Sequence, residues 1–278
     1  MTFSQNTFVT IGAGGMGLAI ARRLGSGQRV VLADFSQSNL DVAARALIDD
    51  GHDVQAHLVD VANFDSVVDL AKVATATGRL AAVVNTAGIA AAQGTARRVY
   101  EVDLLGTANV IDAFLEVMPS GSSLTSISSI ASYLMPEAVS PGLEQHLATA
   151  PRDQLLNHAD IDIQGSPRVA YAVSKRANIV RVQSAAVRQG KEKGVRLNTV
   201  SPGFIATPML RKELGTDAGG AIKAMIVDSP VPRAGTVSDV ANVVAFLTSV
   251  EAAFINGVDI IVDGGLVSGQ RWGPSSSS

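Results

Sequence analysis

The sequence predicts an α/β fold, a doubly wound parallel sheet of seven strands with helices on both faces, and three observations support it. Short apolar runs alternate with longer amphipathic runs along most of the 278 residues. This alternation is typical of parallel strands joined by right-handed helical crossovers. Hydrophobic residues make up 47% of the chain but aromatic residues only 4%. Val-, Ala- and Gly-rich segments suit a sheet that is covered on both faces by closely packed helices.

Each predicted element follows from this alternation. The strands are predicted at residues 7–11, 29–33, 54–58, 81–85, 123–128, 196–200 and 259–262. Segments with apolar residues at helical spacing predict helices at 15–24, 36–50, 64–77, 100–118, 168–189 and 238–249. We expect residues 1–272 to form one domain and the polar residues 273–278 to form a flexible tail.

One segment interrupts the alternation. About forty residues, 130–167, separate the fifth strand from the next long helix and contain Pro136, Pro141, Pro151 and Pro167. A connection of this length inside a compact domain is usually functional or disordered. Short helical patterns at 143–150 and 152–159, which carry Leu143, Leu147, Leu155 and Leu156, favour an ordered helical insertion.

Composition argues against several classes of partner. The net charge is −3 without a Lys/Arg-rich run, so we expect neither a nucleic acid nor a membrane surface as partner. No apolar run is long enough to span a bilayer, and no basic, then hydrophobic, leader precedes the first strand. The chain has no cysteine, and its histidines show no ligand spacing with carboxylates, so no metal site is expected (His52, His57, His146, His158). We expect a cytoplasmic protein that acts on a small molecule.

A glycine-rich turn joins the first predicted strand to the first helix. It reads Gly12-Ala13-Gly14-Gly15-Met16-Gly17. Gly12, Gly14 and Gly17 have the spacing of a Rossmann-type dinucleotide site, in which glycines allow a tight turn and close approach of a pyrophosphate. The helix N-terminus would offer free N–H groups to the phosphates. A glycine-rich turn without a ligand is the alternative.

Asp34 follows the second strand, 17 residues after Gly17. A carboxylate at this position can accept hydrogen bonds from both ribose hydroxyls of the adenosine, and its charge repels a 2′-phosphate. No Lys or Arg occurs at residues 33, 35 or 36. The cofactor predicted is therefore NAD rather than NADP, unless Asp34 only caps the following helix.

Further motifs follow these two in a recognisable order. They are Asp60-Val61, Asn85-Thr86-Ala87-Gly88, Ser129, Tyr171-Ala-Val-Ser-Lys175, Pro202-Gly203 and Thr207. In these motifs the chain resembles the short-chain dehydrogenase/reductase family over nearly its whole length. The resemblance implies that Ser129, Tyr171, Lys175 and Asp103 are catalytic. It also implies that the cofactor contacts Gly12, Gly14, Gly15, Met16, Gly17, Asp34, Asp60, Val61, Asn85, Ala87, Gly88, Tyr171, Lys175, Pro202, Gly203 and Thr207.

The spacing of Tyr171 and Lys175 has a physical consequence. Residues four apart lie on the same face of a helix, so the ammonium group would stabilise the phenolate and lower the tyrosine pKa from about 10. Such a tyrosine can transfer a proton near neutral pH. Of the three tyrosines only Tyr171 has a lysine at this distance. A surface Tyr–Lys pair is the alternative.

Three features depart from the family pattern. The glycine loop is one residue short, so in the family register only Gly12, Gly15 and Gly17 align. Asp103 stands in place of the asparagine that organises a water near the catalytic lysine in the family. Its charge would oppose the effect of Lys175 and raise the pH optimum of oxidation, although an inconsequential isosteric replacement is equally compatible.

The third departure is the separation of Ser129 and Tyr171 by 42 residues, far more than in ordinary members. A comparable insertion occurs in the bacterial 3α-hydroxysteroid dehydrogenase/carbonyl reductases, to which the segment Gly194–Gly203 is also similar. The insertion must lie near the substrate mouth or beside the Tyr171 helix, a common dimer face in the family. We expect a homodimer or homotetramer, and the insertion favours the dimer.

The function predicted is NAD-dependent interconversion of a secondary alcohol and a ketone, such as a steroid or another lipophilic carbonyl. The insertion leucines, with Met135, Phe204, Met209 and Leu210, are candidates for an apolar pocket. One alternative is an NAD-sensing regulator with little turnover. Another is a sugar-nucleotide epimerase or dehydratase, although such chains usually carry a larger C-terminal substrate domain.

Overall fold

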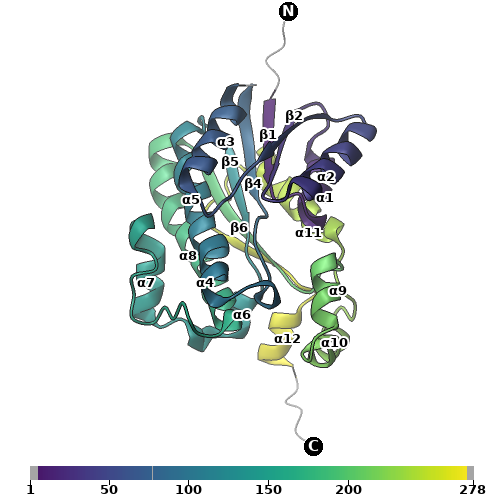
Figure 1. The fold of residues 1–278 in the computed structure, drawn as a ribbon, viewed down its shortest axis with the longest axis vertical. Helices are drawn as coiled ribbons and strands as arrows, with labels where there is room; N and C mark the ends of the chain where they lie inside the picture. Colours follow the sequence, from purple (N-terminus) through teal and green to yellow (C-terminus); the bar gives the residue numbers. More distant parts are fainter. Residues whose placement is uncertain (1–5, 77, 274–278) are drawn as a thin grey trace, which may run out of the picture.

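The computed structural model describes residues 6–76 and 78–273, and its centre is a seven-stranded parallel sheet (Figure 1). The strand order is β3-β2-β1-β4-β5-β6-β7, with every neighbouring pair parallel. The strands are β1 (Asn6–Ile11), β2 (Arg29–Asp34), β3 (Asp53–Leu58), β4 (Arg79–Asn85), β5 (Ser123–Ile127), β6 (Arg196–Pro202) and β7 (Asp259–Val262). The doubly wound parallel sheet predicted from the sequence is confirmed.

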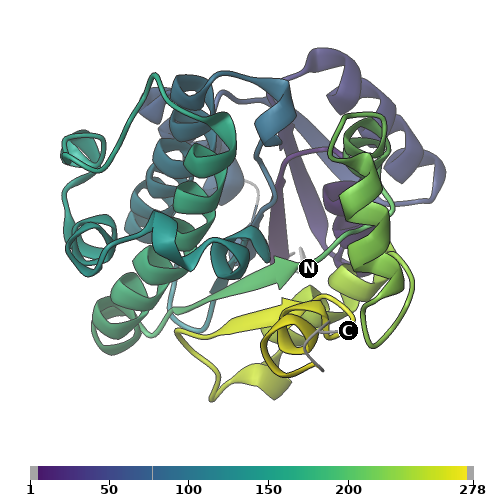
Figure 2. The same ribbon diagram turned by 90° about the horizontal axis from the view of Figure 1, so that it is seen from below.

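Helices cover both faces of this sheet, as Figure 2 shows end-on. Helices α1 (Gly15–Leu24), α2 (Gln37–Asp49) and α11 (Val237–Thr248) pack on one face, and α3 (Phe64–Ala76), α5 (Gly106–Val117) and α8 (Pro167–Lys193) on the other. Alternate residues of one strand enter the two cores, since Val30 and Leu32 of β2 join the first and Val31 and Ala33 the second. Strands buried on both faces explain the continuous apolar runs of the sequence.

The strand order determines where a ligand-binding crevice can form. The chain starts at β1, winds outward to β3, and then returns to place β4 on the other side of β1. The loops after β1 and β4 therefore diverge to opposite faces of the sheet. A crevice forms at such a switch point, beyond the carboxyl ends of the strands.

The insertion at residues 130–167 is ordered and packs along α8. Its helix α7 (Pro141–Thr149) was predicted within two residues, but the helix predicted at 152–159 is wrong, because only a short 3₁₀ turn forms at Arg152–Gln154. Leu143, Leu147 and Leu155 are fully buried in a third core, which they share with α8 and the segment before α5. Arg181 of α8 donates hydrogen bonds to the carbonyl oxygens of Leu147 and Ala150.

Several further elements were not predicted. The helix predicted at 100–118 is preceded by α4 (Ala96–Val99) and begins with a π-helical turn, Tyr100–Leu105, before α5. The long segment after β6 holds α9 (Pro208–Leu214) and α10 (Gly219–Val227), and two short helices, α6 (Ala131–Leu134) and α12 (Leu266–Trp272), complete the chain. The predicted tail lies almost entirely outside the described residues.

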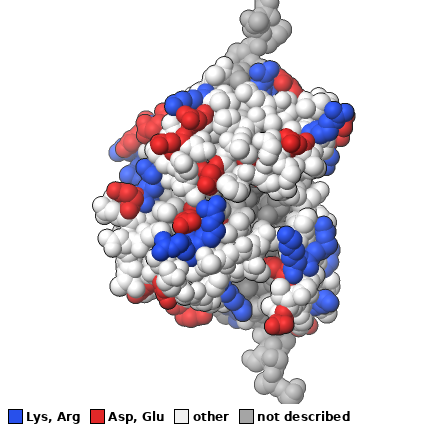
Figure 3. Space-filling model, in the orientation of Figure 1, with Lys and Arg blue, Asp and Glu red and all other residues white. Residues whose placement is uncertain are grey.

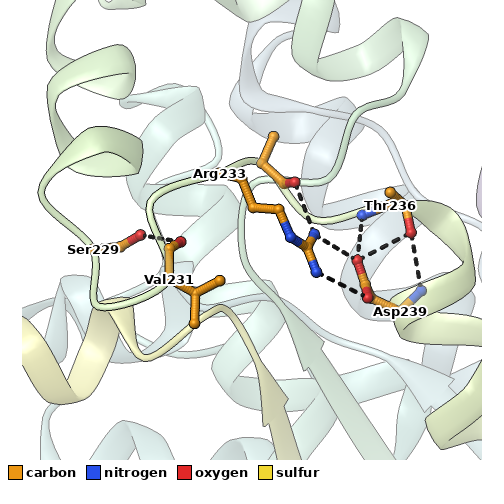
Figure 4. Close-up of polar contacts among 6 residues, drawn as sticks. Ser229, Val231, Arg233, Thr236 and Asp239 are labelled. Atoms are coloured by element: carbon orange, nitrogen blue, oxygen red, sulfur yellow. Dashed lines mark hydrogen bonds and ion pairs between the residues drawn. The ribbon is translucent and has the colours of Figure 1, made fainter.

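A surface ion pair fixes the loop that leads from α10 into α11 (Figure 4). The guanidinium of Arg233 donates to both carboxylate oxygens of Asp239, at 2.8 and 3.2 Å. Asp239 also accepts from the backbone N–H of Thr236, while the Thr236 hydroxyl oxygen accepts from the backbone N–H of Asp239. This reciprocal capping box begins α11 where the sequence predicted a helix start, within one residue.

Residues 6–76 and 78–273 contain neither a membrane-spanning helix nor a cluster of metal-ligating side chains. None of the helices there is both long and apolar enough to cross a bilayer. No three His, Asp or Glu side chains of these residues gather in a way that could hold a metal ion.

Candidate active site

A cavity of about 590 Å³ occupies the crevice beyond β1 and β4. Its walls come from the turn after β1, the ends of β2 and β3, the turn after β4, and α9. Most of the predicted cofactor residues line it, namely Gly12, Gly14, Gly15, Met16, Gly17, Asp34, Asp60, Val61, Ala87, Gly88 and Thr207. Residues spread over almost two hundred positions of sequence are thus brought to one cavity.

The glycines of the turn have two roles: Gly12 and Gly17 allow close packing, whereas Gly14 leaves open space. Gly12 has a φ of 98°, and a Cβ there would lie 2.5 Å from the Thr86 hydroxyl oxygen. A Cβ on Gly17 would collide with the carbonyl oxygen of Gly12, so this glycine lets α1 pack against the turn. Gly14 has nothing within 4 Å of its Cβ position. The turn therefore holds the backbone open toward the cavity at Gly14.

The N-terminus of helix α1 lies at this cavity, and no side chain caps its first N–H groups. Gly14 is the N-cap residue and offers no side chain, and the first turn contains no acidic residue. The first N–H groups of a helix carry a partial positive charge and lack intrahelical partners. This end of α1 is chemically suited to an anionic group such as a phosphate.

Asp34 ties the end of β2 to the glycine turn. One carboxylate oxygen accepts a hydrogen bond from the backbone N–H of Ala13 at 2.6 Å, and the other accepts from the N–H of Ser36 at 2.8 Å. The N-cap of α2 is Ser36, whose hydroxyl accepts from Asn39. The alternative that Asp34 serves only as the cap of this helix is therefore wrong, and Asp34 lines the cavity.

Basic side chains flank the same cavity. Figure 3 shows blue basic groups on both sides of a hollow in this face of the molecule. Arg98 of α4 and Lys212 of α9 line the cavity. The Arg98 guanidinium lies 5.7 Å from the Phe35 ring centroid, 3.3 Å from Glu101 and 3.9 Å from Asp60. Sequence reasoning missed both, because neither lies next to a motif; only folding brings Arg98 to the end of β2.

The turn after β4 contacts the glycine turn through Thr86 and lies near Lys175 through Gly88. The Thr86 hydroxyl donates to the carbonyl oxygens of Ile11 and Gly12, at 3.0 and 3.1 Å. The Asn85 side-chain oxygen accepts from the N–H of Ala87, which places Asn85 beneath the cavity rather than in its wall. A Cβ on Gly88 would lie 2.6 Å from Asp103 Oδ1 and 3.2 Å from Lys175 Nζ. The absence of a side chain at Gly88 thus leaves room for Asp103 and Lys175.

Ser129, Tyr171 and Lys175 form a cluster next to this cavity, but none of the three lines it. Tyr171 and Lys175 project from one face of α8, with Lys175 Nζ 5.3 Å from the centroid of the tyrosine ring. Ser129 follows β5 and hydrogen-bonds with Tyr171. The Ser129 oxygen also accepts from the N–H of Ala131 at 3.2 Å. The three side chains predicted from scattered motifs form one cluster.

The pKa of Tyr171 differs from the expectation. Burial raises it above its usual value, Lys175 and the hydrogen bond with Ser129 lower it, and the charges of Asp103 and Glu213 raise it. The expected net lowering is wrong, because desolvation of the phenolate outweighs the nearby ammonium group. Lys175 acts in the expected direction, and so does Asp103.

Asp103 lies fully buried in the π-helical turn behind this cluster. One carboxylate oxygen accepts from the N–H of Ile89 at 2.9 Å, and the other has no hydrogen-bond partner among the described residues. Burial raises the pKa of Asp103 to about 6, although Lys175 and the Ile89 N–H both act to lower it. At neutral pH a negative charge thus stands behind Lys175.

A second cavity, of about 330 Å³, adjoins the first above Tyr171 and Ser129. Met16, Thr207 and Met209 line both cavities. Of the predicted apolar residues, Met135, Phe204, Met209 and Leu210 line it, as do Pro202 and Gly203. The insertion leucines do not. That prediction is wrong, because Leu143, Leu147 and Leu155 are buried in the core beside α8.

Comparison with known proteins agrees with this geometry. A family model described as short chain dehydrogenase matches residues 5–141, and one described as enoyl-(acyl carrier protein) reductase matches residues 158–267. The short-chain dehydrogenase/reductase bsc3 of Alternaria brassicicola is 39% identical over 95% of this chain and 97% of its own length. The 3-alpha-hydroxysteroid dehydrogenase/carbonyl reductase of Comamonas testosteroni is 28% identical over 85% of this chain and 96% of its own.

Solved structures show the same architecture. A short-chain type dehydrogenase/reductase from Mycobacterium ulcerans superimposes with a TM-score of 0.74 and is 26% identical. The match covers 96% of this chain and 92% of that one. The strand order, the cavity and the Ser129, Tyr171 and Lys175 cluster are therefore found on a scaffold of known type.

Proposed function

Because the chain belongs to the short-chain dehydrogenase/reductase family, we propose that it is an NAD-dependent oxidoreductase that interconverts a secondary alcohol and a ketone. The observation that carries the proposal is that Ser129 and Tyr171, with Lys175 Nζ 5.3 Å from the tyrosine ring, line a cavity that adjoins the first one. The wall of the first cavity includes the uncapped start of α1, and the wall of the second is chiefly apolar. This arrangement suits a dinucleotide in the first and an organic substrate in the second.

The residues of the first cavity fit a dinucleotide. The free space at Gly14 and the uncapped start of α1 suit a pyrophosphate. Lys212 forms no ion pair with any described residue and adds a positive charge to the wall. Thr207 lines both cavities, Pro202 and Gly203 line the second, and the three would hold the nicotinamide end. Asp60 and Val61 would contact the adenine.

Asp34 supports NAD over NADP. Its carboxylate is held by two backbone N–H groups and retains lone pairs that can accept from ribose hydroxyls. A 2′-phosphate at the same place would meet a negative charge. Arg98 also lines this cavity, but its guanidinium already lies 3.3 Å from Glu101 and 3.9 Å from Asp60. The balance of charge favours the unphosphorylated ribose.

The chain's own residues would handle the proton. When an alcohol is oxidised, Tyr171 as phenolate accepts the hydroxyl proton while the C–H bond breaks and the carbonyl C=O forms. The Ser129 oxygen accepts from Ala131, and its hydroxyl hydrogen, which interacts with Tyr171, would donate to the substrate oxygen when substrate binds. Lys175 stabilises the phenolate. The nicotinamide, when bound, supplies the acceptor or donor of the hydride.

A spectrophotometric screen of alcohols and ketones tests the proposal. We expect turnover with NAD(H) that exceeds turnover with NADP(H), and loss of turnover in Tyr171→Phe. Asp34→Ala should reduce the preference for NAD, measured as the ratio of kcat/KM for the two cofactors. Binding of NADH, followed by its fluorescence, provides a readout that is independent of substrate choice. Cofactor binding without turnover of any compound would favour a sensing role instead.

We also propose that the insertion limits assembly to a homodimer. The insertion residues and α8 share a buried core, and Glu144 of α7 forms an ion pair with Arg176 of α8. This face of α8 is thereby covered by the chain itself and is not free for a second copy. Light scattering on the intact protein should give the mass of two chains, and a tetramer would contradict the proposal.

A further inference from the structure

Glu213 stands apart from the other residues of the second cavity. It lies on α9 and is the one carboxylate among the described residues that line this cavity. Its neighbours in the wall are chiefly apolar and include Met209, Leu210, Ile222 and Met225. The side chain is partly buried and accepts no hydrogen bond from any described residue, nor does it form an ion pair with one. The cavity therefore contains an acceptor without a donor.

A partly buried carboxylate destabilises the protein unless it receives a hydrogen bond or pairs with a cation. A carboxylate accepts hydrogen bonds through two oxygens, and a partly desolvated one is destabilised when these remain unused. Burial accordingly raises the pKa of Glu213. Arg168, on α8, lines the same cavity but is exposed and forms no ion pair with Glu213 within 4.0 Å. Water can solvate the arginine, whereas the glutamate faces the space that a substrate would fill.

The cavity places Glu213 within electrostatic reach of the reacting centre. Its charge contributes to the raised pKa of Tyr171, and both residues line one cavity of about 330 Å³. Glu213 belongs to α9, while Tyr171 and Ser129 belong to α8 and the end of β5. A ligand that fills the cavity and presents one oxygen to Tyr171 therefore also extends to Glu213.

We propose that Glu213 accepts a hydrogen bond from a second hydroxyl group of the substrate, so that the enzyme prefers an apolar-bodied diol or hydroxyketone to a simple alcohol. This inference rests on the proposed function and specifies its substrate class. An ammonium group fits less well, because Arg168 contributes a positive charge to the same cavity. A hydroxyl group also suits either protonation state of Glu213, since it can donate to the carboxylate or accept from the acid.

Calorimetric binding to the protein saturated with NADH tests this without turnover. The probes share one ring: cyclohexane-1,4-diol, 4-methylcyclohexanol, in which a methyl group replaces the second hydroxyl, and 4-aminocyclohexanol. We expect the diol to bind about tenfold or more tightly than the methyl compound, as for a hydrogen bond to a charged acceptor. Glu213→Leu should abolish this ratio and Glu213→Gln, which keeps an acceptor oxygen, should retain part of it.

Two arginine variants are the controls. Arg168→Leu changes the other charge of the cavity, and Arg211→Leu makes the same change on α9 outside both cavities; both should keep the preference for the diol. Equal binding of diol and methyl compound, absence of diol binding, or a diol preference that survives in Glu213→Leu would overturn the inference. Tighter binding of the amine, or loss of the preference only in Arg168→Leu, would also do so.

A failure of the proposed function can be distinguished from a failure of this inference about Glu213. It fails if NADH itself does not bind, which fluorescence reports before any probe is added. Circular dichroism and Tm establish that each variant is folded, and Glu213→Gln keeps the test decisive if the leucine variant is unstable.

Discussion

Two aspartates of this protein, each near a basic residue and a backbone N–H, have pKa values shifted in opposite directions. Asp103 lies buried behind Tyr171 and Lys175, where burial raises its pKa to about 6. Asp239 lies at the surface, where hydrogen bonds from Arg233 and Thr236 hold its pKa well below the usual range (Figure 4). The residue types are alike, and the surroundings decide the direction.

The pKa shifts differ in direction because the two carboxylates accept different numbers of hydrogen bonds and are buried from water to different extents. The two oxygens of Asp239 receive four hydrogen bonds from Arg233 and Thr236. Within the described part of the chain, those of Asp103 receive one, from the N–H of Ile89, although the side chain is fully buried. A satisfied surface carboxylate contributes to structure, whereas an unsatisfied buried one remains sensitive to nearby charge. The buried group is therefore the one positioned to influence chemistry.

The largest expected effect follows from removing the Tyr171 hydroxyl, whose pKa Asp103 and Lys175 influence. Tyr171→Phe deletes the hydroxyl and keeps the ring, so the fold should persist while proton transfer is lost. We expect kcat to fall by about 10²- to 10⁴-fold, the usual contribution of general acid–base catalysis. Steady-state rates measure this, with Tyr133→Phe, outside the cluster, as the matched control. Near-parental activity would remove Tyr171 from the mechanism.

Lys175→Met should have the next largest effect, because it removes the charge that lowers the pKa of Tyr171. The rate of alcohol oxidation depends on the phenolate, so its rising limb should move to higher pH and the rate at neutral pH should fall. A pH–rate profile checks both. An unshifted profile with only a lower rate would mean that Lys175 acts by position and not by charge.

Asp103→Asn should move the same profile in the opposite direction. The charge of Asp103 raises the pKa of Tyr171, so a neutral amide should lower it and shift the rising limb of oxidation to lower pH. The parent and variant should differ most above pH 6, where Asp103 is charged. Superimposable profiles would show that the aspartate is a neutral substitute for asparagine.

Asp239→Asn should have the smallest effect and should concern stability rather than rate. The pKa of Asp239 is lower in the folded chain than in the unfolded chain, so the carboxylate stabilises the fold above pH 4 and this contribution is lost as the pH falls. Because the pair is exposed, we expect Tm at pH 7 to fall by about a few degrees or less. The difference from the parent should shrink toward pH 3.

For Asp103 the stability sign is reversed. Its pKa is higher in the folded chain than in the unfolded chain, so its charge disfavours folding increasingly as the pH rises from about 4 to 6. Thermal melts of Asp103→Asn and Asp239→Asn against pH should therefore diverge from the parent with opposite slopes. Parallel slopes would contradict the comparison on which these predictions rest.

The sequence by itself determined the sheet, most of its helices and the members of the cluster that we propose to be catalytic. Apolar runs bounded by glycines fix strands that are buried on both faces, and Tyr171 and Lys175 share a helix face whatever surrounds them. The position of Asp34 after β2 likewise follows from local order. These features depend on residues that are close in the chain, so their spacing carries the information.

Only the tertiary structure decided which side chains meet across elements. Arg98 reaches Phe35 and Asp60, Glu213 enters the second cavity, and the insertion leucines join the core beside α8 instead of the substrate pocket. The net pKa shift of Tyr171 was also decided there, because desolvation depends on every residue that excludes water. Spacing along the chain carries no information about such contacts, since the packing of distant segments creates them.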